Sequence, residues 1–246
     1  MRFFYDDIEI NYQFNDNNSD ELIVFLHGWG DGSKLLYPLD FALKKFSNYS
    51  SLYIDFPPFG ASQTPKKPWT IYNYASMAYE IISKVQKENS FKKITIVGHS
   101  FGGRVAIILC AKYFIGNNLV LLDAAGVLPK RTLKYRFKIL KFKFLKKYFP
   151  NKALKMGSAD YLKLDETMKQ TFKNIVNEDL TYILKMIEAK TLIIFGAKDK
   201  DTPIYMAKIL HKNIWCKNIR CCIISRCIFL KSRLRQSRLN KRLLLY

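Results

Sequence analysis

The chain has 246 residues, of which 49% are hydrophobic, so it is long enough to bury a full core and too apolar to stay disordered. Its net charge of +21 comes from two segments, +10 over residues 127–190 and +11 over residues 202–246, whereas residues 1–126 are neutral. This uneven distribution argues against a globally basic nucleic-acid-binding domain. No apolar run approaches the roughly 18 residues of a membrane-spanning helix, and we expect no secretory signal.

The cysteines indicate a reducing environment. There are five of them, and four lie in the last 31 residues of the chain. An odd number crowded into one segment is not a disulfide framework, so we expect a cytoplasmic protein. The alternative, a zinc site, lacks the paired C-x-x-C spacing, and we expect no metal; the four cysteines are Cys216, Cys221, Cys222 and Cys227.

Apolar runs and helix-length segments alternate along the chain. The first 15 residues alternate loosely in hydrophobicity and predict an antiparallel hairpin at a sheet edge. The later runs are continuous, as is typical of parallel strands covered on both faces; they lie at 22–26, 51–55, 94–97, 119–122 and 192–195. Helices are predicted between them at about 34–47, 70–89 and 101–115. The order predicts an α/β fold with a doubly wound, mostly parallel sheet.

An insertion interrupts this alternation at 127–189. Within it, residues 130–149 carry nine Lys or Arg and an apolar stripe at helical spacing, which predicts a basic amphipathic helix. We interpret the basic face of this helix as solvated, with contact to an anionic membrane surface as the alternative. The predicted domains are an α/β core in two parts, 1–126 and 190–212, the helical basic insertion 127–189 between them, and an atypical tail, 213–246.

The strongest chemical signal is the sequence Gly98-His99-Ser100-Phe101-Gly102. It follows a predicted strand directly and begins a predicted helix, which is the context of the G-x-S-x-G nucleophile elbow. Such a turn is strained and needs small residues on both sides of the serine. The motif therefore predicts Ser100 as a nucleophile.

Two further strand ends carry candidate site residues. The sequence His27-Gly28-Trp29-Gly30 ends one strand, and its backbone N–H groups can form an oxyanion hole together with that of Phe101. Asp199 follows the strand at 192–195, where a carboxylate could orient a histidine. A turn-capping role is the alternative for Asp199, and Asp201 and Asp123 are its rivals as the acid.

With these motifs, the chain resembles the α/β-hydrolase superfamily from about residue 8 to about 212, and in particular its lid-bearing serine esterases and C–C hydrolases. The resemblance includes the segments 55–62 and 121–126. It implies Ser100 as nucleophile, Asp199 as the acid, and the backbone of Trp29 and Phe101 as oxyanion donors. It also implies that the insertion at 127–189 is a helical lid. A serine nucleophile argues against the dehalogenase and epoxide hydrolase branches, which use an aspartate.

The histidine of the family pattern is missing. In the family it lies roughly 25–30 residues after the acid, where this chain has Arg226-Cys227-Ile228. The chain's three histidines are His27, His99 and His211, and none of them lies at that position. From Asn213 onward there is also no Gly, Pro, Asp or Glu. We therefore hypothesise that a shifted reading frame replaced the last strand, the histidine loop and the final helix.

These observations predict an impaired serine hydrolase that acts on a small-molecule carboxylic ester or a related acyl or C–C bond, without a cofactor. No nucleic-acid partner is expected, because the basic tail has no recognisable binding motif. The alternative is a non-catalytic or degenerate hydrolase remnant.

Overall fold

A computed structural model describes residues 1–128, 148, 164–216 and 218–224. Apart from Tyr148, the predicted basic helix at 130–149 lies outside the described residues, and so does the tail from residue 225. The membrane-surface contact expected of that helix therefore stays a prediction. Within the ranges that are described, no helix is both long and apolar enough to cross a membrane.

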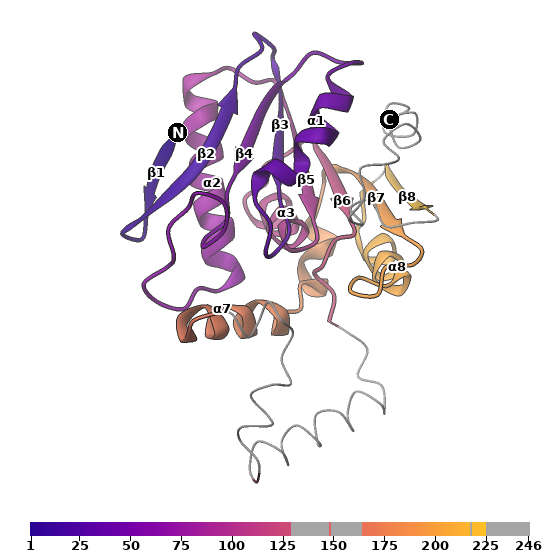
Figure 1. Ribbon diagram of the computed structural model, residues 1–246. Helices are drawn as coiled ribbons and strands as arrows, with labels where there is room; N and C mark the ends of the chain where they lie inside the picture. Colours follow the sequence, from indigo (N-terminus) through magenta and orange to yellow (C-terminus); the bar gives the residue numbers. More distant parts are fainter. Residues whose placement is uncertain (129–147, 149–163, 217, 225–246) are drawn as a thin grey trace.

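The core is one eight-stranded sheet with the order β1-β2-β4-β3-β5-β6-β7-β8 (Figure 1). The two pairs that involve β2 are antiparallel, and all other pairs are parallel. The predicted doubly wound, mostly parallel sheet is therefore confirmed, as is the antiparallel edge hairpin. The strands are β1 (Arg2–Tyr5), β2 (Ile8–Asn15), β3 (Glu21–Leu26), β4 (Ser50–Ile54), β5 (Lys93–His99), β6 (Asn118–Leu122), β7 (Lys190–Gly196) and β8 (Ile219–Ile224).

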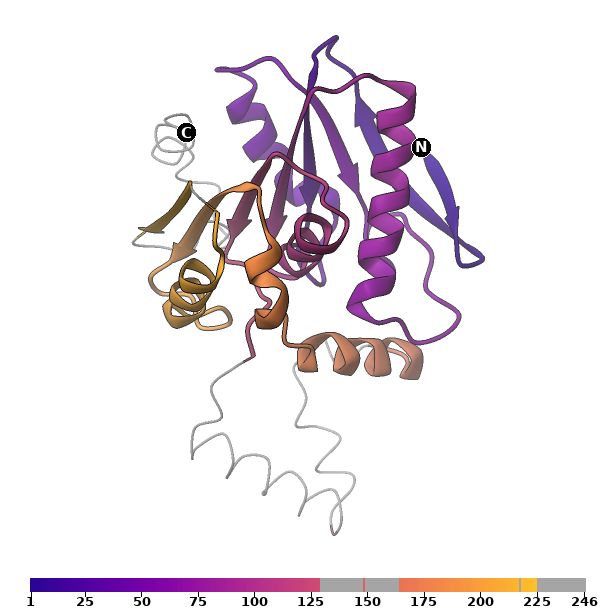
Figure 2. The same cartoon turned by 180° about the vertical axis from the view of Figure 1, so that it is seen from behind.

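Helices cover both faces of the sheet (Figures 1 and 2). In β7, Ile193 and Phe195 enter the larger core cluster, whereas Leu192 and Ile194 enter the smaller one on the opposite face. This explains why the apolar runs are continuous rather than alternating. The larger cluster contains α2 (Ile71–Glu88), α3 (Phe101–Lys112), α8 (Ile204–Asn213) and the short 3-10 helix η2 (Thr181–Met186); the smaller one contains η1 (Ser33–Leu36) and α1 (Tyr37–Leu43).

Gly126, directly before the insertion, meets Leu180 of the returning chain beside α3. The Leu180 N–H donates to the Gly126 carbonyl at 2.9 Å, so the chain leaves and re-enters the core at one point. The guanidinium of Arg104, a buried residue of α3, donates to the Glu178 carbonyl at 2.7 Å. Burial lowers the pKa of Arg104 to about 10, against the opposing charges of Asp179 and Glu178. The Arg104 side chain thus holds the returning segment, which includes α7 (Glu166–Asn177), against the core.

The C-terminal part of the sheet differs from expectation. Strand β8 lies inside the segment 213–246 and pairs with β7 from Ile219 to Ile224. The hypothesis that the last strand is lost was therefore wrong. The reason is local, because the segment is rich in Ile and Cys and can extend the parallel ladder at the open edge of β7. The core sheet thus continues twelve residues past Lys212, up to Ile224.

Candidate active site

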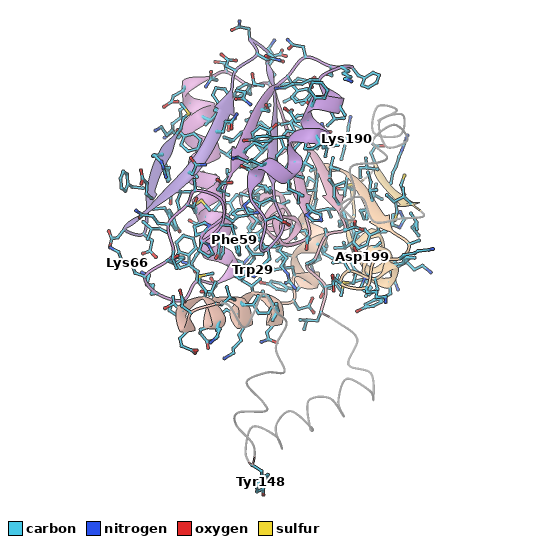
Figure 3. All side chains as sticks on the ribbon, in the orientation of Figure 1. Trp29, Phe59, Lys66, Tyr148, Lys190 and Asp199 are labelled. Carbon is cyan, nitrogen blue, oxygen red and sulfur yellow. The ribbon has the colours of Figure 1, made fainter. Side chains whose placement is uncertain are left out.

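The predicted site residues lie at one edge of the sheet. Trp29 follows β3, Ser100 follows β5, and Asp199 follows β7, while Phe101 is the first residue of α3. Because these strands are parallel, their carboxyl ends meet at the same edge, which is where open α/β sheets bind their ligands. Figure 3 shows Trp29 and Asp199 on this side of the molecule, with Lys190 at the other end of β7.

Ser100 has the strained backbone expected of a nucleophile elbow. Its φ is 49° and its ψ is −110°, a combination that costs a non-glycine residue about 1–3 kcal/mol. Two hydrogen bonds hold it there: the Ser100 N–H donates to the Leu122 carbonyl at 3.0 Å, and the Ala125 N–H donates to the Ser100 carbonyl at 3.0 Å. The elbow is therefore tied to the loop that follows β6.

Glycines are required around the serine because backbone atoms approach closely there. A Cβ added to Gly102 would lie 2.2 Å from the Leu26 carbonyl oxygen, and one added to Gly98 would lie 2.6 Å from the Gly102 oxygen. A Cβ on Gly103 would meet the Ala124 side chain at 2.5 Å. These contacts let β5, α3 and the end of β3 converge on the elbow.

Two backbone donors are available beside Ser100. Among the described residues, nothing accepts a hydrogen bond from the N–H of Trp29 or of Phe101. The Phe101 N–H is also the first donor of α3, where the helix dipole favours negative charge. These two groups have the chemistry of an oxyanion hole, in which one donor contributes about 3–4 kcal/mol to the transition state.

The Trp29 indole is enclosed by aromatic rings from three segments. Its centroid lies 4.9 Å from that of Phe59, 5.5 Å from that of Phe101 and 5.3 Å from that of Phe172. Figure 3 shows Trp29 and Phe59 close together above α7. Neither Phe59 nor Phe172 was predicted as a site residue. Phe59 lies in the segment 55–62, which gave it no role of its own, Phe172 belongs to no motif, and no local spacing links either residue to Trp29.

Asp199 caps the turn between β7 and α8. Its Oδ1 accepts hydrogen bonds from the N–H groups of Asp201 at 2.8 Å and Thr202 at 2.9 Å. The turn-capping interpretation therefore holds for this oxygen. Asp201 itself is exposed. Asp123 is buried, and its Oδ1 accepts from the Gly196 N–H at 2.6 Å, so it joins the ends of β6 and β7.

His27 has a structural role. Its Nε2 accepts a hydrogen bond from the Phe56 N–H at 2.8 Å, so Nε2 carries no proton. The proton is on Nδ1, which donates to the Gly28 carbonyl at 2.8 Å. The ring is fully buried, and this burial lowers its pKa, although the Gly28 carbonyl and Asp55 oppose the shift. Neutral His27 thus fixes the loop that carries Trp29.

The other two histidines do not lie where the family has its base. The His99 ring packs against Gly28, where an added Cβ would lie 2.9 Å from its Nδ1. Burial lowers the pKa of His99 to about 4, with the charge of Asp199 opposing and that of His27 adding to the shift. His211 is exposed near the end of α8. After Ile224, the last residue of β8, the sequence contains no histidine.

The described part of the chain offers no metal site beside this arrangement. No group of three or more His, Cys, Asp or Glu side chains there could hold a metal ion. A cavity of about 520 Å³ lies at the opposite edge of the strands, where Lys93 and Lys190 begin β5 and β7. Because ligands of open parallel sheets bind at the carboxyl edge, we do not assign the substrate to this cavity.

Comparison with known proteins gives consistent matches. Residues 21–129 match the family model described as alpha/beta hydrolase fold. The AB hydrolase superfamily protein YisY of Bacillus subtilis is 27% identical over 221 residues, which cover 78% of this chain and 79% of YisY. The uncharacterized hydrolase YugF of the same organism is 26% identical over 243 residues, covering 87% and 85%. An esterase from Exiguobacterium antarcticum has the same fold, with a TM-score of 0.71, 21% identity and coverage of 97% and 95%.

Proposed function

Because this chain belongs to the α/β-hydrolase superfamily and is a hydrolase by family, we propose that it cleaves carboxylic esters or related acyl or C–C bonds with Ser100 as the nucleophile. The observation that carries the proposal is the strained Ser100 backbone beside two N–H groups without described acceptors. The strained serine backbone lowers the stability of the fold, and a turn with only a structural role would not need this strain. Such strain is typical of active sites.

In the proposed reaction, the Ser100 hydroxyl oxygen attacks the substrate carbonyl. The N–H groups of Trp29 and Phe101 donate to the oxyanion that forms, and these donors cost little reorganisation because α3 and the loop after β3 already hold them. Asp199 would orient and stabilise a protonated base at the end of β7. No cofactor is required for this chemistry.

In this proposal, no histidine takes the proton of Ser100. His27 is buried in a structural position, His99 is partly buried against Gly28, His211 lies near the end of α8, and the sequence after β8 contains no histidine. The proton must therefore pass to water or to a base in solution. In serine hydrolases the loss of the triad histidine lowers turnover by about six orders of magnitude, and the oxyanion hole and substrate binding preserve a residual rate. We accordingly propose a slow, serine-dependent esterase.

The ester class is supported by the fold neighbour from Exiguobacterium antarcticum, which is an esterase. Three partly buried aromatic rings lie beside the proposed oxyanion hole, those of Trp29, Phe59 and Phe172. They favour an uncharged organic substrate, because they would remove water from a charged group without replacing its hydrogen bonds.

A second function, a non-catalytic binding protein, is favoured by the missing histidine alone. A binding protein would use the same site, and we would then expect a small ester or its carboxylic acid product to bind without turnover. The two functions are therefore separated by kinetics rather than by binding.

Replacing Ser100 with Ala should reduce the hydrolysis of p-nitrophenyl acetate to the background of the protein surface. The parent should show slow turnover that free imidazole accelerates, because imidazole can take the proton that the chain cannot. The measurement is the release of p-nitrophenol with and without imidazole. The matched control is Ser83→Ala on α2, which should retain the parent rate.

If the parent and Ser100→Ala release p-nitrophenol equally, with and without imidazole, Ser100 is not a nucleophile and the binding protein becomes the better description. Equal loss in Ser83→Ala would mean that the loss in Ser100→Ala is not specific to the site.

A further inference from the structure

We propose that Phe172 of α7 is a positioning residue that fixes the oxyanion donor at Trp29. The proposal rests on the proposed function, since it concerns the donor of that same site. It means that the insertion does more than cover the substrate, because it also completes the geometry of the oxyanion hole.

His27 fixes the start of the loop that carries Trp29, at Gly28. The Trp29 N–H has no acceptor among the residues described, and the nearest turn bond, from the Asp31 N–H to the Gly28 carbonyl, is 3.3 Å long. Gly30 has a φ of +84° and open space around the position of a Cβ. The direction of the Trp29 N–H therefore depends on how the indole is packed.

Two of the three rings around the indole belong to the rigid core. Phe101 is buried at the start of α3. Phe59 lies in a tight turn in which its N–H donates to the Phe56 carbonyl at 2.7 Å. The Asp55 carboxylate accepts from the Ala61 N–H at 3.0 Å and from the Ser33 N–H at 2.9 Å, so this turn is tied to the loop after β3. These two rings set one side of the indole.

The third ring comes from the insertion. Helix α7 lies across the carboxyl edge of the sheet (Figures 1 and 2). It is attached to the core on both sides of Phe172: the Trp69 N–H donates to Thr171 Oγ1 at 3.0 Å, and Asn174 Nδ2 donates to the Trp69 carbonyl at 3.2 Å. Phe172 therefore approaches Trp29 at a fixed point, with a ring separation of 5.3 Å.

Removing Phe172 would leave the indole supported only by the two core rings. A ring pair contributes about 0.5–1.5 kcal/mol beyond its buried area, which is enough to let Trp29 occupy a second orientation. A displacement of about 1 Å at a catalytic group can cost as much as a hundredfold in rate. The effect should appear in turnover more than in substrate binding, because the donor acts on the transition state.

The first test observes the donor directly by NMR of the full chain labelled with [15N]tryptophan. Only Trp29, Trp69 and Trp215 then give signals, and Trp29→Phe identifies those of Trp29. Phe172→Ala should shift or broaden both the backbone and the indole signals of Trp29 and leave those of the exposed Trp215 unchanged. Phe172→Tyr, which retains the ring, should restore them.

The matched control is Met168→Ala, which removes a buried side chain from the same face of α7. It should weaken the docking of α7 while the Phe172 ring beside the indole is kept. If Met168→Ala changes the Trp29 signals as much as Phe172→Ala does, or if Phe172→Ala leaves them unchanged, the proposal is overturned. A thermal melt of each variant confirms that the spectra come from folded protein.

The second test uses p-nitrophenyl acetate with imidazole. Phe172→Ala should lower kcat about tenfold and change KM less than twofold, with Phe172→Tyr close to the parent. A change confined to KM would mean that Phe172 only lines the substrate pocket, and would overturn the positioning role. Absence of Ser100-dependent turnover in the parent would instead contradict the proposed function, and the NMR test would still decide the contact between Phe172 and Trp29.

Discussion

The free energy of unfolding should fall by about 3 kcal/mol between pH 6.5 and pH 4. Burial lowers the pKa of His99 from the ordinary value of 6.5 to about 4, and burial lowers that of His27 as well. The unfolded chain therefore binds more protons than the folded chain below pH 6.5, so stability is fully present above that pH and is lost as the pH falls. Each pKa unit corresponds to about 1.4 kcal/mol, which gives about 3 kcal/mol for His99 alone.

The measurement is a series of urea unfolding curves between pH 7.5 and pH 4. Protonated His27 would place a proton on Nε2, directly facing the Phe56 N–H that now donates to it, so the Trp29 loop should loosen as the protein weakens. The variant His99→Asn should lower the dependence on pH, whereas His211→Asn, which replaces an exposed histidine, should reproduce the parent slope. A stability that is flat from pH 7 to pH 4.5 would contradict the neutral, buried state of these rings.

The substitution Gly102→Ala should destabilise the fold by about 3 kcal/mol, at the upper end of the range for overpacked sites. The added Cβ would lie 2.2 Å from the Leu26 carbonyl oxygen, and this neighbour is backbone that cannot rotate away. To relieve the clash, α3 must move away from the end of β3, which also separates Ser100 from the loop that carries Trp29. Stability and serine-dependent turnover should therefore be lost together.

Gly30→Ala is the matched comparison. Gly30 has a φ of +84° but no atom within 4 Å of the position of a Cβ, so Ala there adds strain without a collision. It should cost about 1–2 kcal/mol. Urea unfolding of both variants gives the two values. Equal losses would show that the close approach at Gly102 is not what constrains the elbow.

Much of this architecture was predictable from the sequence, for identifiable reasons. Continuous apolar runs separated by helix-length segments arise because β3, β5, β6 and β7 are buried on both faces. The elbow could be found because a strained serine needs glycines at fixed positions around it. Local spacing thus identified Ser100, and the motif before it placed Trp29 at the same edge.

Other features depend on contacts that no local spacing encodes. Phe172 lies 143 positions after Trp29 in the sequence, and only the folding back of α7 brings their rings together. Strand β8 was missed because its residues follow an abrupt change in composition, whereas the open edge of β7 decides whether they pair. The histidines were identified by type, but only the hydrogen bonds of His27 reveal which ring nitrogen carries the proton.

The hydrogen bond between Leu180 and Gly126 affects which changes of length this chain can accept in evolution. Because it brings the two ends of the segment between these residues together, residues can be added to or removed from that segment without moving any strand. Each doubling of a flexible loop costs only about 0.6 kcal/mol of closure entropy. One residue added between Leu26 and Trp29, in contrast, would displace the donor from Ser100. The length of the insertion is thus free to drift, while the short stretches around the elbow must keep their register.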